Sequence, residues 1–269
     1  MSDILTSLHG RLLGLDSQGR LICTAGFRSG ANGSQFDPAS PLTVARFDDF
    51  TGGSQAFSTT IIDGWRSRVG TTNTVNWTTT DAVSGTVVGT IGDTTASMAA
   101  SGVQLDSSLD WKANQGELTF QTRIKLSAIT NIAVYVGFTD QVGALEMPIQ
   151  SAASANTITT NATDGVGFMF DTSMSTDDWW LVGVANNTDA THEDTGYAPV
   201  AGTYETLRIE VSTAGLARFF RNGIQVGSAM TGAVTATVAL TPVIAGFNRT
   251  TSGNPTLTVD YMYTSALRA

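Results

Sequence analysis

Residues 204–228 constrain the fold more than any other part of the chain, because two turn signals divide them into three strand-like runs. In the first run, residues 204–211, apolar and polar side chains alternate, as in a strand with one buried face. The sequence Ser-Thr-Ala-Gly at 212–215 then reverses the chain. The next run ends at Asn222-Gly223, the strongest short-range hairpin signal. The stretch predicts a three-stranded antiparallel meander.

Strand patterns recur from residue 41 onward, and the clearest is at 117–126. There Leu118 and Phe120 face one way while Gln121 and Arg123 face the other, which indicates a half-buried antiparallel strand. Besides the meander, strands are predicted at 42–50, 97–105, 117–126, 131–138, 165–171, 179–185, 240–247 and 257–263. Strands with one wet face each must pack as two sheets. The fold class is therefore all-β, a two-sheet antiparallel sandwich, in which residues 140–164 form a long loop without strands.

The composition of the chain restricts the classes of molecule that it is expected to bind. Charged residues make up only 14% of the chain, and the net charge is −9. Nucleic acid and anionic membranes are bound through clustered Lys and Arg, so neither is expected as a partner. Cys23 is the only cysteine, which excludes an intramolecular disulfide framework. The N-terminus lacks a signal-peptide pattern, and no segment is long and apolar enough to span a membrane.

Residues 1–40 differ from the rest, and we predict a boundary between an N-terminal arm (1–40) and a sandwich domain (41–269). Within the arm, residues 11–16 and 20–23 have the pattern of a hairpin. A hairpin this short cannot bury its own apolar side chains. It packs either on a partner surface or on the main domain, and the sequence does not decide between the two.

Glycoside hydrolysis requires two carboxylates placed a few ångströms apart. The chain has five Glu, and none has an acidic partner two or four positions away in a predicted strand. A pair built from separate strands stays open. No catalytic residues are predicted, and the protein is expected not to be an enzyme.

Two loops offer weaker hypotheses. The run His192-Glu193-Asp194, with Asp189 nearby, could bind Ca²⁺ through oxygen ligands, but its spacing matches no EF-hand pattern and a solvated loop is favoured. No metal or cofactor is predicted. Three aromatic residues are candidates for stacking on a glycan: Trp179, Trp180 and Tyr197. The alternative for the paired indoles is that one faces the core and the other covers a sheet edge or a subunit contact.

The stretches 109–112, 116–126, 136–140, 165–171, 204–211, 219–223 and 259–261 resemble the concanavalin A-like lectin/glucanase jelly-roll superfamily, in its laminin G-like form. The resemblance runs from residue 47 to the end. The hydrolases of that superfamily carry a Glu-x-Asp-x-x-Glu strand, which is absent here, so no catalytic residues carry over. A short N-terminal segment before a Thr/Gly-rich jelly roll is similar to structural proteins of tailed bacteriophages, including head decoration (cement) proteins and fibres.

This resemblance implies a non-enzymatic virion protein on the capsid exterior, made in the host cytoplasm. It would attach to the major capsid protein through the arm, stabilise the shell and form a homotrimer. The candidate capsid-contact residues are Leu5, Leu8, Arg11, Leu12, Leu13, Leu15, Arg20, Leu21, Phe27 and Arg28. The alternative is a glycan- or receptor-binding module of a head or tail fibre.

Overall fold

The computed structural model describes residues 43–51, 64–80, 85–152 and 156–267, together with the backbone of five short strands before residue 43. The strands of the first sheet are β7 (Arg66–Val69), β10 (Val103–Asp106), β12 (Ile132–Thr139), β15 (Gly165–Asp171), β16 (Trp179–Ala185), β17 (Thr188–Asp189), β18 (Glu193–Asp194) and β22 (Thr241–Asn248). They are arranged in the order β17-β16-β15-β12-β22-β10-β7, and β18 also pairs with β16.

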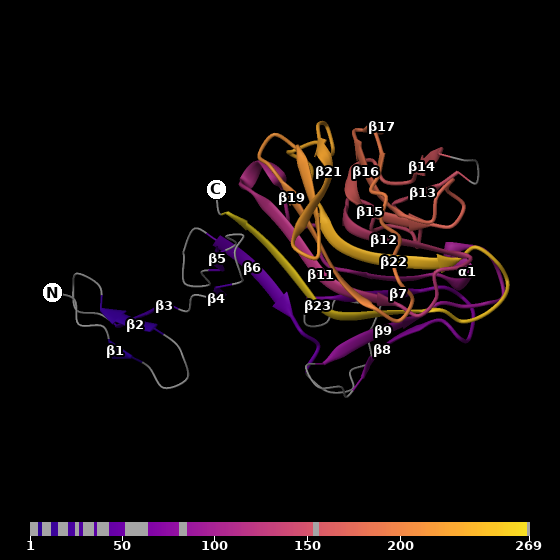
Figure 1. Cartoon of the computed structure of the whole chain (residues 1–269), viewed down its shortest axis with the longest axis horizontal. Helices are drawn as coiled ribbons and strands as arrows, with labels where there is room; N and C mark the ends of the chain where they lie inside the picture. The colour runs from indigo at the N-terminus through magenta and orange to yellow at the C-terminus, as the bar shows by residue number, and fades with distance from the viewer. Residues whose placement is uncertain are drawn as a thin grey trace.

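The strands of the second sheet are β6 (Thr43–Asp48), β8 (Asn76–Thr80), β9 (Thr86–Thr90), β11 (Leu118–Leu126), β19 (Tyr204–Val211), β20 (Ala217–Arg221), β21 (Ile224–Met230) and β23 (Thr256–Leu267). Their order is β21-β20-β19-β11-β23-β9-β8, and β6 also pairs with β23. All pairings in both sheets are antiparallel, and the sheets pack face to face (Figure 1). The predicted two-sheet antiparallel sandwich is confirmed.

The main core lies between the sheets, where aromatic rings from both sheets meet. Phe168 of the first sheet contacts Phe219 of the second edge-on, with ring centroids 5.4 Å apart. Phe120 and Phe138 form a similar pair at 5.6 Å. Edge-to-face contacts of this kind add to the free energy gained from burial.

The predicted meander is confirmed as β19, β20 and β21. Asn222 and Gly223 both have positive φ, at 51° and 82°. Positive φ at both central residues is the condition for the tight hairpin turn that matches the right-handed twist of the strands. The Asn-Gly signal therefore fixes the register between β20 and β21.

The first sheet corrects the prediction of one wet face per strand. Every residue of β12, β15 and β22 is buried, because a second hydrophobic cluster covers the outer face of this sheet. Residues 140–164, expected to be a loop without strands, supply part of that cover. They include the hairpin β13 (Ile149–Ser151) and β14 (Ile158–Thr160), whose strand β13 contacts β12 and β15 (Figure 1). Strands of three residues are too short to show an alternating pattern in the sequence.

The predicted strand at 97–105 is wrong in its first half. Residues Met98–Ser101 form the helical turn α1, and β10 begins only at Val103. Met-Ala-Ala is a sequence of good helix formers, and the Ser101 N–H donates to the Ser97 carbonyl at 2.9 Å. A second short helix, η1 (Ala113–Gln115), precedes β11. No described helix is long and apolar enough to cross a membrane.

Before residue 43, β1 (Leu5–Thr6), β2 (Leu12–Leu15) and β3 (Leu21–Thr24) form a three-stranded sheet, and β4 (Phe27–Arg28) pairs with β5 (Gln35–Phe36). The predicted hairpin corresponds to β2 and β3, with Leu13 opposite Cys23. The boundary near residue 40 stays a prediction.

Candidate functional site

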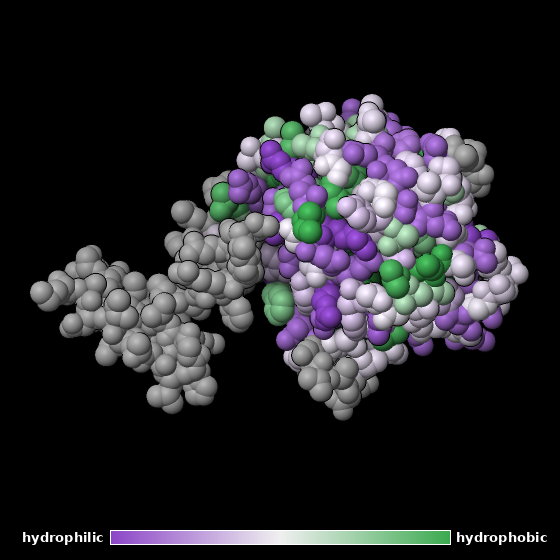
Figure 2. Space-filling view, viewed as in Figure 1, coloured by the Kyte–Doolittle hydropathy of each residue, from purple (hydrophilic) through white to green (hydrophobic). Residues whose placement is uncertain are grey.

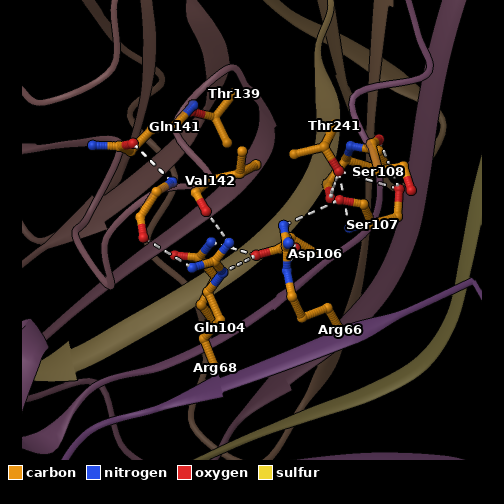
Figure 3. Close-up of polar contacts among 12 residues, drawn as sticks. Arg66, Arg68, Gln104, Asp106, Ser107, Ser108, Thr139, Gln141, Val142 and Thr241 are labelled. Atoms are coloured by element: carbon orange, nitrogen blue, oxygen red, sulfur yellow. Dashed lines mark hydrogen bonds and ion pairs between the residues drawn. The ribbon is translucent and has the colours of Figure 1, made fainter. Parts of the chain in front are cut away.

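The outer face of the first sheet carries a buried polar cluster around Asp106 (Figure 3). The Asp106 carboxylate is fully buried and accepts hydrogen bonds from Arg66 Nε at 2.7 Å and Arg68 Nε at 2.9 Å. Gln104 Nε2 donates to the same carboxylate at 2.6 Å. The register places Arg66 opposite Asp106 and Arg68 opposite Gln104, so adjacent strands bring the four side chains together.

This cluster holds a loop. Arg68 also donates to the carbonyl of Val142 and, at 3.4 Å, to that of Gly143, both in the turn after β12 (Figure 3). A buried carboxylate and a buried guanidinium need several hydrogen-bond partners to offset their lost hydration. The two loop carbonyls are among these partners, so the contacts hold the loop against the sheet. The cluster is therefore a structural element rather than an open binding site.

A second ion pair anchors the β13–β14 hairpin. Arg249 Nε donates to Asp171 Oδ1 at 2.9 Å, and Arg249 also donates to the Ser151 carbonyl at 3.1 Å. The Ser151 N–H in turn donates to Asp171 Oδ2 at 2.9 Å. The two ion-pair clusters thus hold described parts of residues 140–164, at Gly143 and Ser151, against the outer face of the first sheet.

The outer face of the second sheet is open in the part of the chain that the structure describes. Burial alternates along β11 and β19, so every second side chain faces outward and is half-buried. The registers align five outward side chains across five neighbouring strands. In order from β20 to β6, this row is Phe220, Arg208, Gln121, Tyr263 and Phe47.

A second row lies two residues along the strands and consists of Thr206, Arg123 and Tyr261. The rows contact each other, since Gln121 Nε2 donates to Tyr261 Oη at 2.7 Å and the rings of Phe47 and Tyr261 lie 5.9 Å apart. The eight residues of the two rows are called the outer belt below.

Arginine side chains of the outer belt lie against aromatic rings. The Arg208 guanidinium is 4.1 Å from the Phe220 ring centroid, and that of Arg123 is 4.2 Å from the Tyr204 ring. Each also forms an ion pair, Arg208 with Glu210 at 3.1 Å and Arg123 with Asp260 at 2.7 Å. These contacts hold the side chains against the sheet.

The tyrosines of the outer belt stay protonated at neutral pH. Burial raises the pKa of the Tyr261 phenol, although its hydrogen bond with Gln121 lowers it in part. Burial likewise raises the pKa of Tyr263. Both hydroxyl groups can therefore donate and accept hydrogen bonds beside an aromatic ring. The belt offers apolar ring surface together with amide, guanidinium and hydroxyl groups.

A cavity of about 420 Å³ opens where β6 and the end of β23 meet the turn after Leu109. Its walls include Arg46, Asp110, Trp111 and Leu267. Arg46 lies 3.7 Å from Asp110, so the two charges in the cavity compensate each other. The cavity shows no group of unusual reactivity.

The structure corrects two of the predicted stacking residues. Trp179 is 1% exposed, packs between the sheets against Phe168 and donates its indole N–H to Glu205. Trp180 is 6% exposed and belongs to the second hydrophobic cluster, since the first sheet is buried on both faces. Neither ring offers a free face to a sugar. Tyr197 is 50% exposed, with the Arg221 guanidinium 5.2 Å from its ring.

The predicted capsid-contact residues cannot be assessed from their side chains. Leu8, Arg11 and Arg20 lie outside the described residues. For Leu5, Leu12, Leu13, Leu15, Leu21, Phe27 and Arg28, the structure describes only the backbone strands. Their role stays a prediction.

The side chains of the acidic loop, residues 192–194, contact neighbouring parts of the chain. Glu193 accepts a hydrogen bond from the Ser228 N–H at 2.9 Å, and Asp194 accepts one from Thr176 Oγ1 at 2.7 Å. The His192 ring contacts Trp180 at 5.7 Å. Within the described ranges, no three or more His, Cys, Asp or Glu side chains are grouped to hold a metal ion.

Sequence reasoning placed Gln121 and Arg123 on a wet face but missed the aromatic members of the outer belt. Tyr261 and Tyr263 do alternate with buried positions along β23, whereas β6, the strand of Phe47, has no buried position. That alternation was a usable signal. What the sequence lacked was the order of the strands, which alone brings the rings together.

Solved structures share this fold. The carbohydrate recognition domain of Emp47p matches with a TM-score of 0.52 at 11% identity, over 86% of this chain and 97% of that one. A β-1,3-glucanase from Mycobacterium marinum matches with 0.54 at 11%, over 81% and 97%. The β-glucanase of Bacillus licheniformis matches with 0.52 at 12%, over 82% and 97%. No family model and no curated protein matches the chain.

These likenesses establish a concanavalin A-like, glucanase-like jelly-roll fold. They also correct the prediction that the protein is not an enzyme, because β-glucanases are among the structures that share the sandwich. That prediction rested on sequence patterns that are absent: a pair of carboxylates within one predicted strand, and the Glu-x-Asp-x-x-Glu motif. A missing motif does not exclude activity on a scaffold that glycoside hydrolases use.

Proposed function

We propose that this protein binds carbohydrate through the outer belt. The observation that carries the proposal is the alignment of aromatic rings and hydrogen-bonding side chains on the sheet face that the described chain leaves open. Aromatic rings pack against the apolar C–H faces of sugars, while amide, guanidinium and phenol groups bond to sugar hydroxyls.

The dimensions of the belt suit an extended glycan. Five neighbouring strands give four spacings of about 4.8 Å, so the first row is about 19 Å long. A ligand crossing the strands would meet Phe47 and Tyr263 near one end and Phe220 at the other. Figure 2 shows one side of the molecule, on which hydrophilic and hydrophobic side chains of the described residues are mixed.

The structural neighbours support the same class of ligand. One is a carbohydrate recognition domain and others are β-glucanases. The proposal extends that ligand class to this chain on the strength of its own belt residues.

The test measures binding of the full-length protein to a panel of polysaccharides by isothermal titration calorimetry. Phe47→Ala and Tyr263→Ala should each weaken binding by about two- to tenfold, since one aromatic contact contributes about 0.5–1.5 kcal/mol. Ile224→Ala removes an apolar side chain that is 71% exposed outside the belt and should have no effect. The same incubations are examined for shortened glycans, because the fold is shared with glucanases.

Tyr197→Ala tests the remaining stacking candidate from the sequence. Loss of binding in this variant, with normal binding by Phe47→Ala and Tyr263→Ala, would move the site away from the belt. Failure of the parent protein to bind any glycan of the panel would overturn the proposed function.

As a second candidate function, we propose attachment to a bacteriophage capsid through residues 1–40. It is favoured by the N-terminal sheet, whose strands β1, β2 and β3 pair with one another and with no strand of the sandwich. Such an arm would bind the major capsid protein and leave the belt free on the virion exterior, in a homotrimer.

Co-sedimentation with undecorated capsids tests the second candidate. Full-length protein should bind saturably, and protein lacking residues 1–40 should stay in the supernatant. Equal sedimentation of both would place the attachment site elsewhere, and absence of binding by either would remove this candidate. Sedimentation velocity of the same samples tests the trimer.

A further inference from the structure

The central strands of the outer belt carry more cations than anions on their outward side, although the protein as a whole is acidic. The chain has a net charge of −9. On β11, β19, β20 and β23, however, the outward-facing ionisable side chains are four cations and two anions. They are Arg123, Lys125, Arg208, Arg218, Glu210 and Asp260.

Both anions are already neutralised within the belt region. Glu210 pairs with Arg208 and Asp260 pairs with Arg123. Lys125 and Arg218 form no ion pair with any described residue. The positive charge that remains on this face therefore belongs to these two side chains.

Lys125 and Arg218 flank the belt on opposite sides. Along β11, Lys125 follows Arg123 of the second row by two residues, and it lies opposite Tyr204, with its Nζ 4.7 Å from that ring centroid. Arg218 precedes Phe220 of the first row by two residues on β20 and lies opposite Glu210. A glycan lying along the belt would thus pass between two uncompensated cations.

We infer that the glycan bound by the outer belt is acidic and carries carboxylate or sulfate groups. The inference rests on the proposed function and adds the substrate class. Its physical basis is a division of contacts. The aromatic rings and neutralised ion pairs of the belt would contact the sugar rings of the glycan. Acidic substituents that project to either side would then meet Lys125 or Arg218. Elsewhere the negative charge of the protein repels a polyanion, which directs it to this face.

A nucleic acid is a poorer match to the same features. It carries a charge at every nucleotide, and proteins bind it by neutralising several consecutive phosphates with clustered cations. Two separated cations on an acidic protein do not supply that cluster. Single-stranded DNA is therefore included in the test as a competing polyanion.

The experiment measures affinities of the full-length protein for alginate, dextran sulfate, laminarin and a single-stranded DNA oligomer. Alginate presents carboxylates, dextran sulfate presents sulfates, and laminarin is neutral, so the first two arms identify the anionic group. We expect binding to at least one acidic glycan, at least tenfold tighter than to laminarin. That affinity should fall when NaCl is raised from about 0.05 M to about 0.5 M, because salt screens exposed charges.

The double variant Lys125→Gln/Arg218→Gln should lose at least tenfold in affinity for the acidic glycan and keep its weak affinity for laminarin. Lys112→Gln is the matched control for each single variant, since it also removes one positive charge, outside this face, and should leave binding unchanged. The two single variants are measured as well, each with its thermal unfolding, so that the test does not depend on the double variant folding.

The outcomes separate this inference from the proposed function. Tighter binding of laminarin than of both acidic glycans would overturn the inference and leave carbohydrate binding intact. Equal binding of DNA and acidic glycan, or full affinity in the double variant, would also overturn it. Failure to bind any glycan would overturn both.

Discussion

Asp106 is the residue on which the polar structure of the first sheet most depends. Its fully buried carboxylate faces two guanidinium groups whose side chains are only 19% and 15% exposed. Two buried cations sharing one anion are stable only while that anion is present. The same cluster holds the turn at Val142 against the sheet, because Arg68 donates a hydrogen bond to the Val142 carbonyl.

Asp106→Ala should therefore lower the free energy of unfolding by about 3–5 kcal/mol, the cost of leaving a buried charge without its partner. Urea unfolding followed by circular dichroism measures it. Asp110→Ala removes a half-exposed carboxylate that is 3.7 Å from Arg46, and it should cost less than about 1 kcal/mol. Similar losses for both variants would show that burial does not set the cost.

Asp178 makes a contribution to the free energy of unfolding that depends on pH. Burial, followed by the negative charge of Asp194, raises the pKa of Asp178 above its ordinary 3.8. The folded state then holds this proton more tightly than the unfolded state. The contribution of Asp178 is favourable at low pH and is lost as pH rises through its folded pKa.

Asp178→Asn should consequently raise the melting temperature at pH 7 and change it little near pH 3, where the Asp178 carboxyl is protonated. Differential scanning calorimetry at the two pH values measures the difference. Asp189→Asn makes the same change of charge at an exposed site and should show no such pH-dependent gain. A destabilised Asp178→Asn protein at pH 7 would mean that the carboxylate is favourable as an ion.

At the scale of elements, two turns flank β20 and depend on glycine for different reasons. Gly215 and Gly223 have nearly the same φ, 77° and 82°. A Cβ on Gly223 would meet no atom within 4 Å, whereas a Cβ on Gly215 would lie 2.2 Å from the Val234 carbonyl oxygen. The turn at Gly223 needs glycine for backbone conformation alone, whereas the turn at Gly215 also needs it for space.

Gly223→Ala should cost about 1–2 kcal/mol, the price of left-handed backbone for an L-residue. Gly215→Ala should cost clearly more, because the backbone near Val234 must also move. Equilibrium unfolding in urea compares the two variants. Equal losses in the free energy of unfolding would show that the chain after Thr231 can move away from the added methyl group without further destabilisation.

At the scale of the whole molecule, the described strand pairings of the two sandwich sheets do not include the N-terminal strands. The outermost described pair of β6 joins Thr43 to Leu267, and β1, β2 and β3 pair only with one another. Among the described side chains, the large core is built from residues 50–266.

Protein consisting of residues 41–269 should therefore unfold in one cooperative transition. Its melting temperature should lie within about 3 °C of the full-length value, which for a domain of this size corresponds to less than about 1 kcal/mol. Thermal unfolding by circular dichroism measures both. A fall of more than about 10 °C would show that residues 1–40 are part of the folded sandwich, and would contradict the predicted boundary.

The sequence alone determined the sandwich. Alternation along residues 117–126 and the Asn222-Gly223 turn are local signals, because side-chain direction and turn conformation depend on neighbouring residues only. The same signals placed Gln121 and Arg123 on an outer face. They do not extend to short strands such as β13, whose structure comes from packing on a sheet built elsewhere.

Only the tertiary structure decided which outer face can bind a ligand. Described residues of the segment 140–164 share a hydrophobic cluster with Trp180 on the first sheet, whereas the described chain leaves the second sheet open and aligns Phe47, Tyr263 and Gln121. Strand order joins residues that are more than 200 positions apart in the chain. That order is set by the burial free energy of the whole core, a long-range quantity that no local pattern of residues records.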